Sequence, residues 1–244
     1  EPASPSTWLM GQAYGNTTGA YNFGTAWYSA GQGLHFGIDI SMPCGTPLIA
    51  VADGEVIYAD NLTFGAGPHN LILRHPQAGV TTLYGHLLDR PPVQQFQLVK
   101  QGDIVGYSGD PDVTCDSRPH LHLEVRSLDY QIAYNPVDYI NAPWDALVSI
   151  GSYSRSLFAM DLNNPRQWMS LYDQPPTAFG GARLNAYAES WPPKNEDTPP
   201  QNTPPMRPYT ALPAGTWGMQ PLTMDGCCAV HWWNPTNSNL AYVI

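Results

Sequence analysis

The stretch RPHLHLEV, residues 118–125, decides how this chain folds and which chemistry it carries. Successive side chains of a strand point to opposite faces, so His120 and His122 share one face and the three apolar residues share the other. A second stretch, HFGID, begins with His35 and ends with Asp39, which the same alternation places together. Two histidines and one carboxylate, with a fourth position left for water, are the ligand count of a catalytic zinc site. The two stretches therefore predict a zinc site. They contain three histidines, so one histidine is not needed as a ligand.

The composition indicates an exported domain with little helix. The net charge of -10 and the lack of a basic run argue against nucleic acid as a partner and against docking on anionic membranes. Charged residues make up 12% of the 244 residues, well below the roughly 25% of an average domain, so long helices held by charge pairs are not expected. No apolar stretch reaches the roughly 18 residues of a membrane span, so we expect no membrane insertion. The chain begins with Glu1 rather than methionine, and we expect that a signal peptide or lipobox was removed upstream.

Nearly all secondary-structure signals are β. Three turn signals interrupt apolar runs: Asp53-Gly54 in residues 47–59, residues 75–79 in 70–84, and residues 101–103 in 98–107. Each predicts a hairpin. We expect an all-β fold, an antiparallel sheet with one face packed and the other forming the floor of a substrate groove. Residues 8–34 show little periodicity and predict a long loop that forms a groove wall.

Five ordered blocks resemble the lysostaphin-type (LytM-type) zinc endopeptidases, which cut peptide cross-links in bacterial cell walls. The blocks are HFGID at 35–39, GTPLIAVADGEVI at 45–57, YGHL at 84–87, VKQGDIVGYSG at 99–109 and PHLHLEVR at 119–126. The resemblance covers roughly residues 8–140. An isolated His-x-His motif carries little information, whereas five blocks in the family's order are specific.

The resemblance implies the roles of five residues. The family's metal ligands fall on His35, Asp39 and His122, and its two further catalytic histidines fall on His86 and His120. It also implies Zn2+ as the cofactor, peptidoglycan peptides as the substrate, and a bacterial location outside the cytoplasm, either secreted, periplasmic or on the cell surface. Zinc lowers the pKa of its bound water to about 7. One histidine would then move the water proton to the leaving amine while the other donates to the developing oxyanion, and the sequence does not assign the two roles.

Two further features concern the predicted groove. Glu124 shares the face of His120 and His122, so it would accept a ring N–H or pair with a nearby arginine, and both roles stay open. Residues 110–117 stand where the family has a short Gly/Thr-rich turn, which bears on substrate preference. Some relatives cut glycine cross-bridges and others cut D-amino-acid links, and the sequence favours neither.

The four cysteines allow three disulfide pairings. If the family fold holds, Cys44 and Cys115 lie in loops that rim the metal site, and we expect a bridge between them. Cys227 and Cys228 are adjacent, so a bond between them would be strained, and two free thiols are the alternative. A bridge from Cys44 to either of them would instead clamp the carboxy-terminal part over the catalytic domain.

The composition changes after the family blocks, which predicts a metallopeptidase domain over residues 1–145 and a Pro-rich extension over residues 146–244. Seven prolines in residues 191–208 predict an extended linker. Short strands are expected at residues 157–160, 168–172, 216–222 and 240–244. The last two strands, with WWNPTNS between them at residues 232–238, resemble blade sequence of a TolB-like β-propeller. We therefore expect a piece of a longer protein, with an extension that contacts another domain or chain.

Two other classes of function fit part of the pattern. A catalytically silent wall-binding or regulatory module would keep the fold and lose the ligands, but all five site residues are present. A biotinyl or lipoyl carrier would need a modified lysine at a hairpin tip, and Lys100 lies in no such motif. His69, His75 and His231 complete no ligand spacing and are expected to be ordinary surface or core histidines. The sequence favours a zinc endopeptidase.

Overall fold

The computed structural model of the chain describes residues 9–23, 28, 33–142, 144, 159–161, 168–180, 218–224, 227–234 and 237–243. The chain divides into two compact units, Glu1–Lys194 and Asn195–Ile244. The predicted division after residue 145 stays a prediction, and the proline-rich stretch 191–208 lies outside the described residues.

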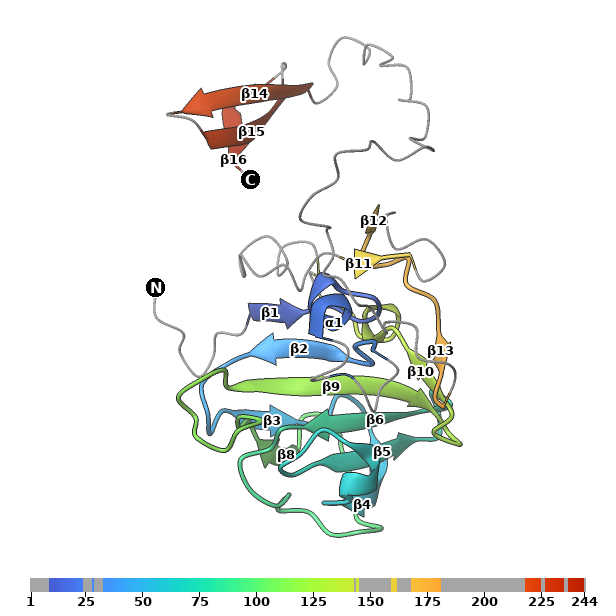
Figure 1. Ribbon diagram of the computed structural model, residues 1–244. Coiled ribbons are helices and arrows are strands. Elements are labelled where there is room, and N and C mark those ends of the chain that lie inside the picture. The colour runs from blue at the N-terminus through green and yellow to red at the C-terminus, as the bar shows by residue number, and fades with distance from the viewer. Residues whose placement is uncertain are drawn as a thin grey trace. The chain divides into compact units, whose positions relative to one another are not determined.

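A nine-stranded antiparallel sheet forms the body of the first unit (Figure 1). Its main path runs β1-β2-β9-β6-β5-β4-β7, and β10 pairs with both β9 and β13. The strands are β1 (Leu9–Gln12), β2 (Ile38–Ser41), β4 (Gly54–Ala59), β5 (Leu71–His75), β6 (Val80–Gly85), β7 (Leu98–Val99), β9 (His120–Ser127), β10 (Ile132–Tyr134) and β13 (Thr177–Ala178). All of these pairings are antiparallel. The predicted all-β antiparallel fold is confirmed.

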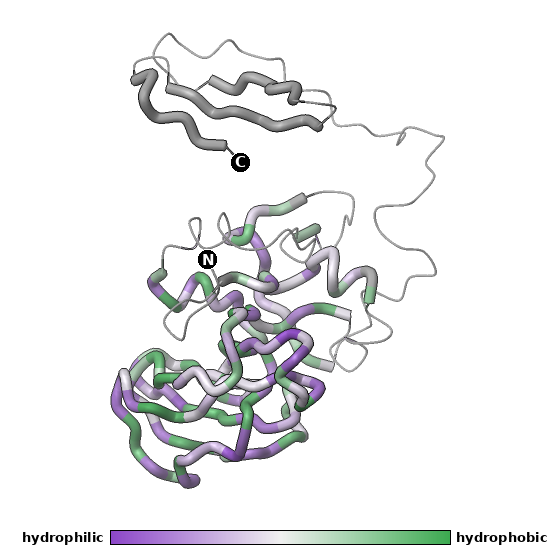
Figure 2. The backbone as a smooth tube through the Cα atoms, turned by 90° about the vertical axis from the view of Figure 1, so that its left-hand side faces the viewer, coloured by the Kyte–Doolittle hydropathy of each residue, from purple (hydrophilic) through white to green (hydrophobic). Residues whose placement is uncertain are grey.

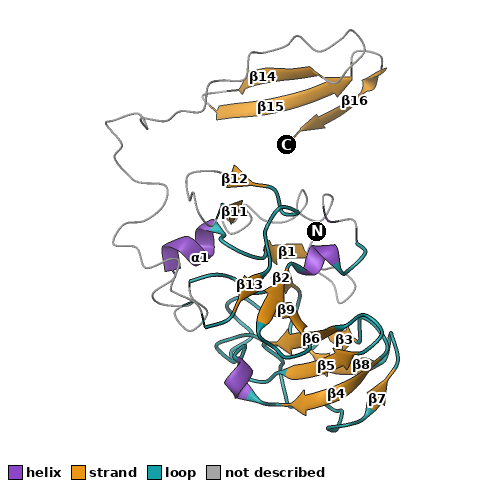
Figure 3. Cartoon of the chain, turned by 90° about the vertical axis from the view of Figure 1, so that its right-hand side faces the viewer, coloured by secondary structure: helices purple, strands orange, loops and turns teal. Residues whose placement is uncertain are grey.

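Helix is confined to short pieces in the described residues (Figure 3). They are α1 (Thr18–Phe23) and the 3-10 turns η1 (Leu62–Phe64) and η2 (Pro136–Asp138). None of the described helices has the length and apolar character to cross a membrane. The prediction of an uninterrupted loop over residues 8–34 is wrong, because β1 and α1 lie within it. β1 gains its hydrogen bonds from β2, a partner that the local sequence does not reveal.

Only one of the three predicted hairpins forms. β5 and β6 pair across residues 76–79, as expected. The segments around residues 47–59 and 98–107 do not fold back on themselves; they pair with each other, β3 (Pro47–Ile49) with β8 (Ile104–Tyr107) and β4 with β7. The two bends interlock, since Ala50 N donates to Asp103 O at 2.9 Å and Gly102 N donates to Ala50 O at 3.0 Å. The turn residues therefore mark corners in a longer strand pair.

The alternation expected of strand β9 holds in the core. Leu121 and Leu123 are 5% and 3% exposed and join the main apolar cluster, together with Ile38 and Ile40 of the neighbouring β2. Figure 2 shows hydrophobic and hydrophilic segments following one another along the first unit. The polar face of β2 and β9 is thereby left for the site.

Short strands outside the main sheet account for the other strand predictions. β11 (Ala159–Met160) pairs with β12 (Trp168–Met169). In the second unit, β14 (Gly218–Met224), β15 (Cys227–Asn234) and β16 (Asn237–Val243) form a three-stranded antiparallel sheet. Strands were expected at all of these places except β15. The resemblance to a β-propeller stays a prediction.

Candidate metal and catalytic site

β2 and β9 run side by side and carry two of the three candidate ligands. Asp39 in β2 pairs directly with His122 in β9. His35 precedes β2, and its backbone pairs with Gly15 through hydrogen bonds of 2.7 and 3.0 Å. The approach of the two strands depends on Gly37, because a Cβ there would lie 2.5 Å from a carbonyl oxygen of β9 and 3.0 Å from the ring of His122. Gly37 thus lets the candidate ligands His35 and Asp39 lie close to His122.

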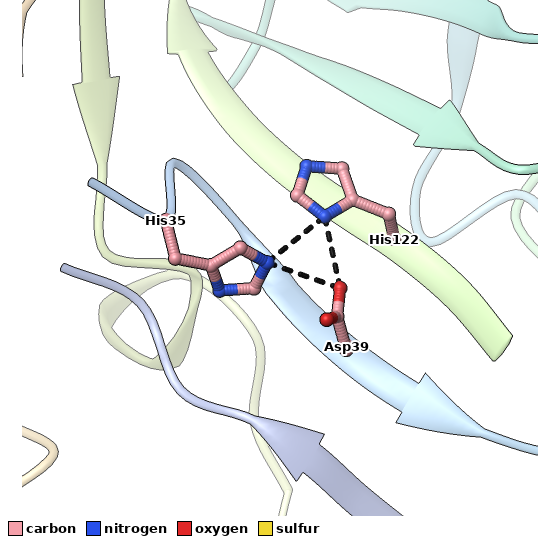
Figure 4. Close-up of side chains that lie close together, drawn as sticks. All are labelled: His35, Asp39 and His122. Carbon is pink, nitrogen blue, oxygen red and sulfur yellow. Dashed lines mark hydrogen bonds and ion pairs between the residues drawn. The ribbon is translucent and has the colours of Figure 1, made fainter. Parts of the chain in front are cut away.

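Three side-chain atoms converge between these strands (Figure 4). His35 Nε2 lies 3.1 Å from Asp39 Oδ1 and 3.1 Å from His122 Nδ1. His122 Nδ1 lies 2.9 Å from Asp39 Oδ1. Within the described part of the chain, this is the group of His, Cys, Asp and Glu side chains whose atoms are close enough to share a metal ion. The three residues predicted as ligands are brought together.

The outer nitrogens of the two rings determine what the inner atoms offer. His35 Nδ1 lies 2.7 Å from the carbonyl of Ala13, which only accepts, so this nitrogen carries a proton. His122 Nε2 donates in the same way to the Glu124 carboxylate at 2.9 Å. In neutral rings, His35 Nε2, His122 Nδ1 and Asp39 Oδ1 are then three acceptors that face one another without a donor. A cation fits this set, and an outer hydrogen bond on each histidine is typical of metal ligands.

The charges around the cluster agree with this assignment. Burial opposes ionisation of Asp39, yet His35 and His120 hold the pKa of its carboxyl well below the usual range. Burial likewise opposes a charge on His122, but Asp39 and Glu124 raise the pKa of its ring to about 9. Without metal, a proton on His122 balances the carboxylate, and a divalent cation would replace that proton.

His86 and His120, predicted to be catalytic, border the cluster. Their ring centroids are 4.8 Å apart, and the ring of His86 lies 5.6 Å from that of His122. His120 Nε2 is 3.7 Å from Asp39 Oδ1. His86 Nδ1 donates to the carbonyl of Gly67, and His120 Nδ1 donates at 2.6 Å to the carbonyl two residues before it. With Nδ1 engaged in this way, Nε2 is the nitrogen of each ring that is left for proton transfer.

His86 occupies a strained backbone position directly after β6. Its φ of 55° lies in the left-handed region that residues other than glycine rarely adopt. The position is held from both sides, since its N–H donates to Ala66 O at 2.9 Å and its ring donates to the next carbonyl, that of Gly67. Burial and the neighbouring His122 lower the pKa of the ring to about 3, so the ring is neutral at physiological pH. Strain of this kind is concentrated at functional sites.

Glu124 fills both of the roles that the sequence left open. One carboxylate oxygen accepts from His122 Nε2 at 2.9 Å, and the other accepts from Arg126 Nε at 2.5 Å. Arg126 in turn donates to the carbonyl of Phe64 at 3.0 Å and lies 4.4 Å from the ring centroid of Phe179. Burial opposes a charge on Glu124, but Arg126 and His122 lower its pKa to about 2. The carboxylate therefore stays ionised and fixes the ring of His122.

The disulfide expected from the family resemblance is present between Cys44 and Cys115, with Cα atoms 5.8 Å apart. It joins the loop after β2 to the loop before β9. In the second loop, the buried carboxylate of Asp110 accepts from the backbone N–H groups of Ser117 at 3.3 Å and Arg118 at 3.0 Å. The stretch that departs from the family pattern is thus fixed at both ends. The side chains of the other two cysteines lie outside the described residues.

Tyr28 is a neighbour of the site that the sequence did not single out. Its ring meets that of His35 edge-on, with centroids 6.0 Å apart, and its hydroxyl donates to Gln12 Oε1 at 2.8 Å. Burial and the charge on Asp39 raise the pKa of the hydroxyl. No motif surrounds Tyr28, so only the folded structure shows that it lies beside a candidate ligand.

Two of the remaining histidines have partners away from the site. His69 Nδ1 lies 3.0 Å from Asp60 Oδ1. His75 is buried, and its ring contacts Asp53 O and Thr82 Oγ1, each at 2.9 Å. The side chain of His231 lies outside the described residues.

Comparison with known proteins agrees with the motifs and the geometry. Residues 33–138 match the model of peptidase family M23. Lysostaphin of Staphylococcus simulans is 29% identical over 137 residues, which are 55% of this chain and 26% of lysostaphin. The glycyl-glycine endopeptidase ALE-1 of Staphylococcus capitis is 29% identical over 139 residues, 56% of this chain and 36% of that protein.

A solved structure of the catalytic domain of lysostaphin from Staphylococcus simulans is 26% identical and covers 55% of this chain and 93% of that domain, with a TM-score of 0.45. The chain spans only about a quarter to a third of the full length of these curated relatives. The five sequence blocks, the cluster of candidate ligands and the family match lie in the same part of the chain. Residues 33–138 thus match peptidase family M23, in the same part of the chain that is similar to lysostaphin.

Proposed function

We propose that this chain is a zinc-dependent endopeptidase that hydrolyses peptide cross-links of bacterial peptidoglycan. His35, Asp39 and His122 would hold the metal. The observation that carries the proposal is the convergence of His35 Nε2, His122 Nδ1 and Asp39 Oδ1, which lie 2.9 to 3.1 Å apart. Nitrogen and carboxylate ligands of this number suit zinc with an open fourth position.

The chain's own residues supply the proton transfers. Zinc in this position contributes Lewis acidity, which polarises a carbonyl and makes water acidic near pH 7. Because Nδ1 of His86 and of His120 is engaged with a carbonyl, Nε2 is the nitrogen through which either ring would take a proton from the attacking water and return it to the leaving amine. The other ring, once protonated, donates to the developing oxyanion. The two rings meet edge-on with centroids 4.8 Å apart, so both lie beside the same part of the cluster.

The substrate follows from the relatives rather than from the geometry. Lysostaphin is described as an antimicrobial peptidase and ALE-1 as a glycyl-glycine endopeptidase. Peptidoglycan lies outside the cytoplasm, where the disulfide between Cys44 and Cys115 would persist. Glycine bridges and D-amino-acid links are both candidates, and the loop of residues 110–117 would help to select between them.

The test combines metal analysis with digestion. The purified chain should contain about one zinc per molecule and should release peptides from a panel of peptidoglycans, identified by mass spectrometry. His122→Ala should lose most of the metal and the activity. Full zinc content and full hydrolysis in His122→Ala would show that the ligand assignment is wrong. Zinc binding by the wild type without release from any peptidoglycan would favour the silent, wall-binding alternative.

A further inference from the structure

Two described stretches beyond the end of the family match at residue 138, residues 159–161 and 168–178, contact the segment next to His35. β11 lies beside α1 (Figures 1 and 3). Ala159 of β11 forms an isolated β-bridge with Thr17, the residue before α1. The N–H of Met160 donates to the carbonyl of Asn16 at 2.9 Å. Both residues of β11 are buried, with exposed fractions of 1% and 0%.

Gln174 is the centre of this contact. The side chain is 3% exposed, donates from Nε2 to Met160 O at 3.3 Å and accepts at Oε1 from Asn16 N at 3.5 Å. It packs on Gly15, whose φ is 97° and where a Cβ would lie 2.4 Å from Gln174 Oε1. The glycine and the buried amide are therefore fitted to each other.

Tyr14 makes a second contact with the same segment. Its hydroxyl lies 3.1 Å from Ala133 O, 3.2 Å from Pro175 O and 3.2 Å from Thr177 Oγ1. The residue is 2% exposed. It thus ties residues 13–17 to β10 and β13 at once.

The opposite side of the same segment holds His35. The carbonyl of Ala13 accepts a hydrogen bond from His35 Nδ1 at 2.7 Å. The backbone of Gly15 exchanges two hydrogen bonds with the backbone of His35. The rotation of the ring, and with it the aim of Nε2, depends on where that carbonyl lies. Residues 13–15 are in contact with His35 on one side and with residues 174–177 on the other.

We propose that residues 159–161 and 168–178 form a brace that aims His35 at the metal, with Gln174 and Tyr14 as positioning residues. The proposal rests on the metal site proposed above. Residues that orient a ligand from behind affect metal affinity although they never touch the metal. The catalytic unit of this chain would then need a segment that the family domain does not include.

The experiment uses the full chain and the variant Gln174→Met, which keeps the length of the side chain and removes both hydrogen bonds. Zinc affinity, measured by competition with a chelator, should fall about tenfold, within the range typical for loss of a ligand's supporting partner. The matched control is Val56→Ala, a cavity in β4 at a residue that is 0% exposed. It should lower the unfolding temperature and leave the zinc affinity of the folded protein unchanged.

A second readout does not need the metal. In the zinc-free wild type, long-range ¹H–¹⁵N NMR spectra should show His35 with its proton on Nδ1. Gln174→Met should give mixed tautomers, and Val56→Ala should not. If Gln174→Met does not fold, Tyr14→Phe takes its place in both measurements, with an expected loss of zinc affinity of several-fold. Wild-type zinc affinity and a wild-type tautomer in the folded variant would overturn the brace. Lack of zinc binding by the wild type would instead overturn the metal site.

Discussion

Glu124 couples the candidate metal site to the sheet through two buried partners. Its hydrogen bond to His122 fixes which ring nitrogen faces the cluster, while its pair with Arg126 keeps it ionised. Strand alternation alone placed Glu124 on the face of His122, so this contact was within reach of the sequence. The sequence could not predict that the carbonyls of Ala13 and Gly67 orient His35 and His86, because these carbonyls lie 22 and 19 residues away in the chain.

Replacement of Glu124 by glutamine should weaken its hydrogen bonds with both His122 and Arg126. We expect zinc affinity to fall about tenfold or more, because the ring of His122 loses a charged acceptor. The free energy of unfolding should fall by about 3–5 kcal/mol, because Arg126 is left buried without a carboxylate. Chelator competition and urea denaturation measure the two effects. Glu55→Gln is the control, since its pair with Arg74 is partly exposed; it should cost under about 1 kcal/mol and leave zinc binding intact. Equal zinc affinities in the two variants would argue against the role of Glu124.

The two histidines beside the cluster should separate metal binding from chemistry. His86→Ala and His120→Ala are each expected to retain zinc and to lose roughly a hundredfold or more in kcat, because each removes an acid, a base or an oxyanion donor. Metal content and steady-state rates on the same peptidoglycan test this. Should either variant lose zinc to the extent of His122→Ala, that residue belongs among the ligands.

At the scale of elements, the pairing of strands is what the sequence predicted least well. Turn residues at 53–54 and 101–103 are local signals, and they predicted two hairpins where the structure has one interlocked pair of bent segments. The hairpin of β5 and β6 was predicted because its partner is the next strand along the chain. The pairing of β2 with β9 joins residues 79 to 85 positions apart and was not predicted; the sequence indicated only that Asp39 and His122 belong to one metal site.

Gly37 tests how closely β2 must approach β9. In Gly37→Ala, the added methyl group would meet a carbonyl of β9 at 2.5 Å and the His122 ring at 3.0 Å, so the strands must separate. We expect a loss of about 1–3 kcal/mol in unfolding free energy and about a tenfold loss of zinc affinity. Gly45→Ala is the control: its φ of 77° makes alanine cost about 1 kcal/mol, but nothing lies within 4 Å, so zinc affinity should not change. Unchanged zinc binding in Gly37→Ala would show that the ligands tolerate a wider spacing.

At the scale of the molecule, a disulfide joins two loops of the first unit that are far apart in the chain. Cys44 and Cys115 are separated by 71 positions, and a loop of this length is associated with roughly 4 kcal/mol in the chain-entropy model. The double variant Cys44→Ala/Cys115→Ala should therefore lose up to about 4 kcal/mol of unfolding free energy in urea. Wild-type protein under strong reductant should match the double variant. If natively exported protein yields Cys44 and Cys115 as free thiols, the bridge does not form.

The stability of the whole unit should also depend on pH through His75. Burial lowers the pKa of this ring below its ordinary value near 6.5, and the hydrogen bond to Asp53 O opposes the shift only in part. Below about pH 6.5 the unfolded chain binds a proton at His75 that the folded chain does not bind. The contribution of His75 is then complete above that pH and is lost as the pH falls toward the folded pKa, by at most about 1.4 kcal/mol per pH unit.

Urea denaturation of wild type and His75→Gln from pH 7.5 to pH 5 isolates this contribution, because every other titrating group is common to both. The wild type should lose unfolding free energy faster than the variant over this interval. Parallel curves would mean that His75 keeps an ordinary pKa in the folded protein, and a steeper curve for the variant would mean that the folded state favours the charged ring. Either result would imply that the surroundings of His75 disfavour the charged ring less than its 2% exposure suggests.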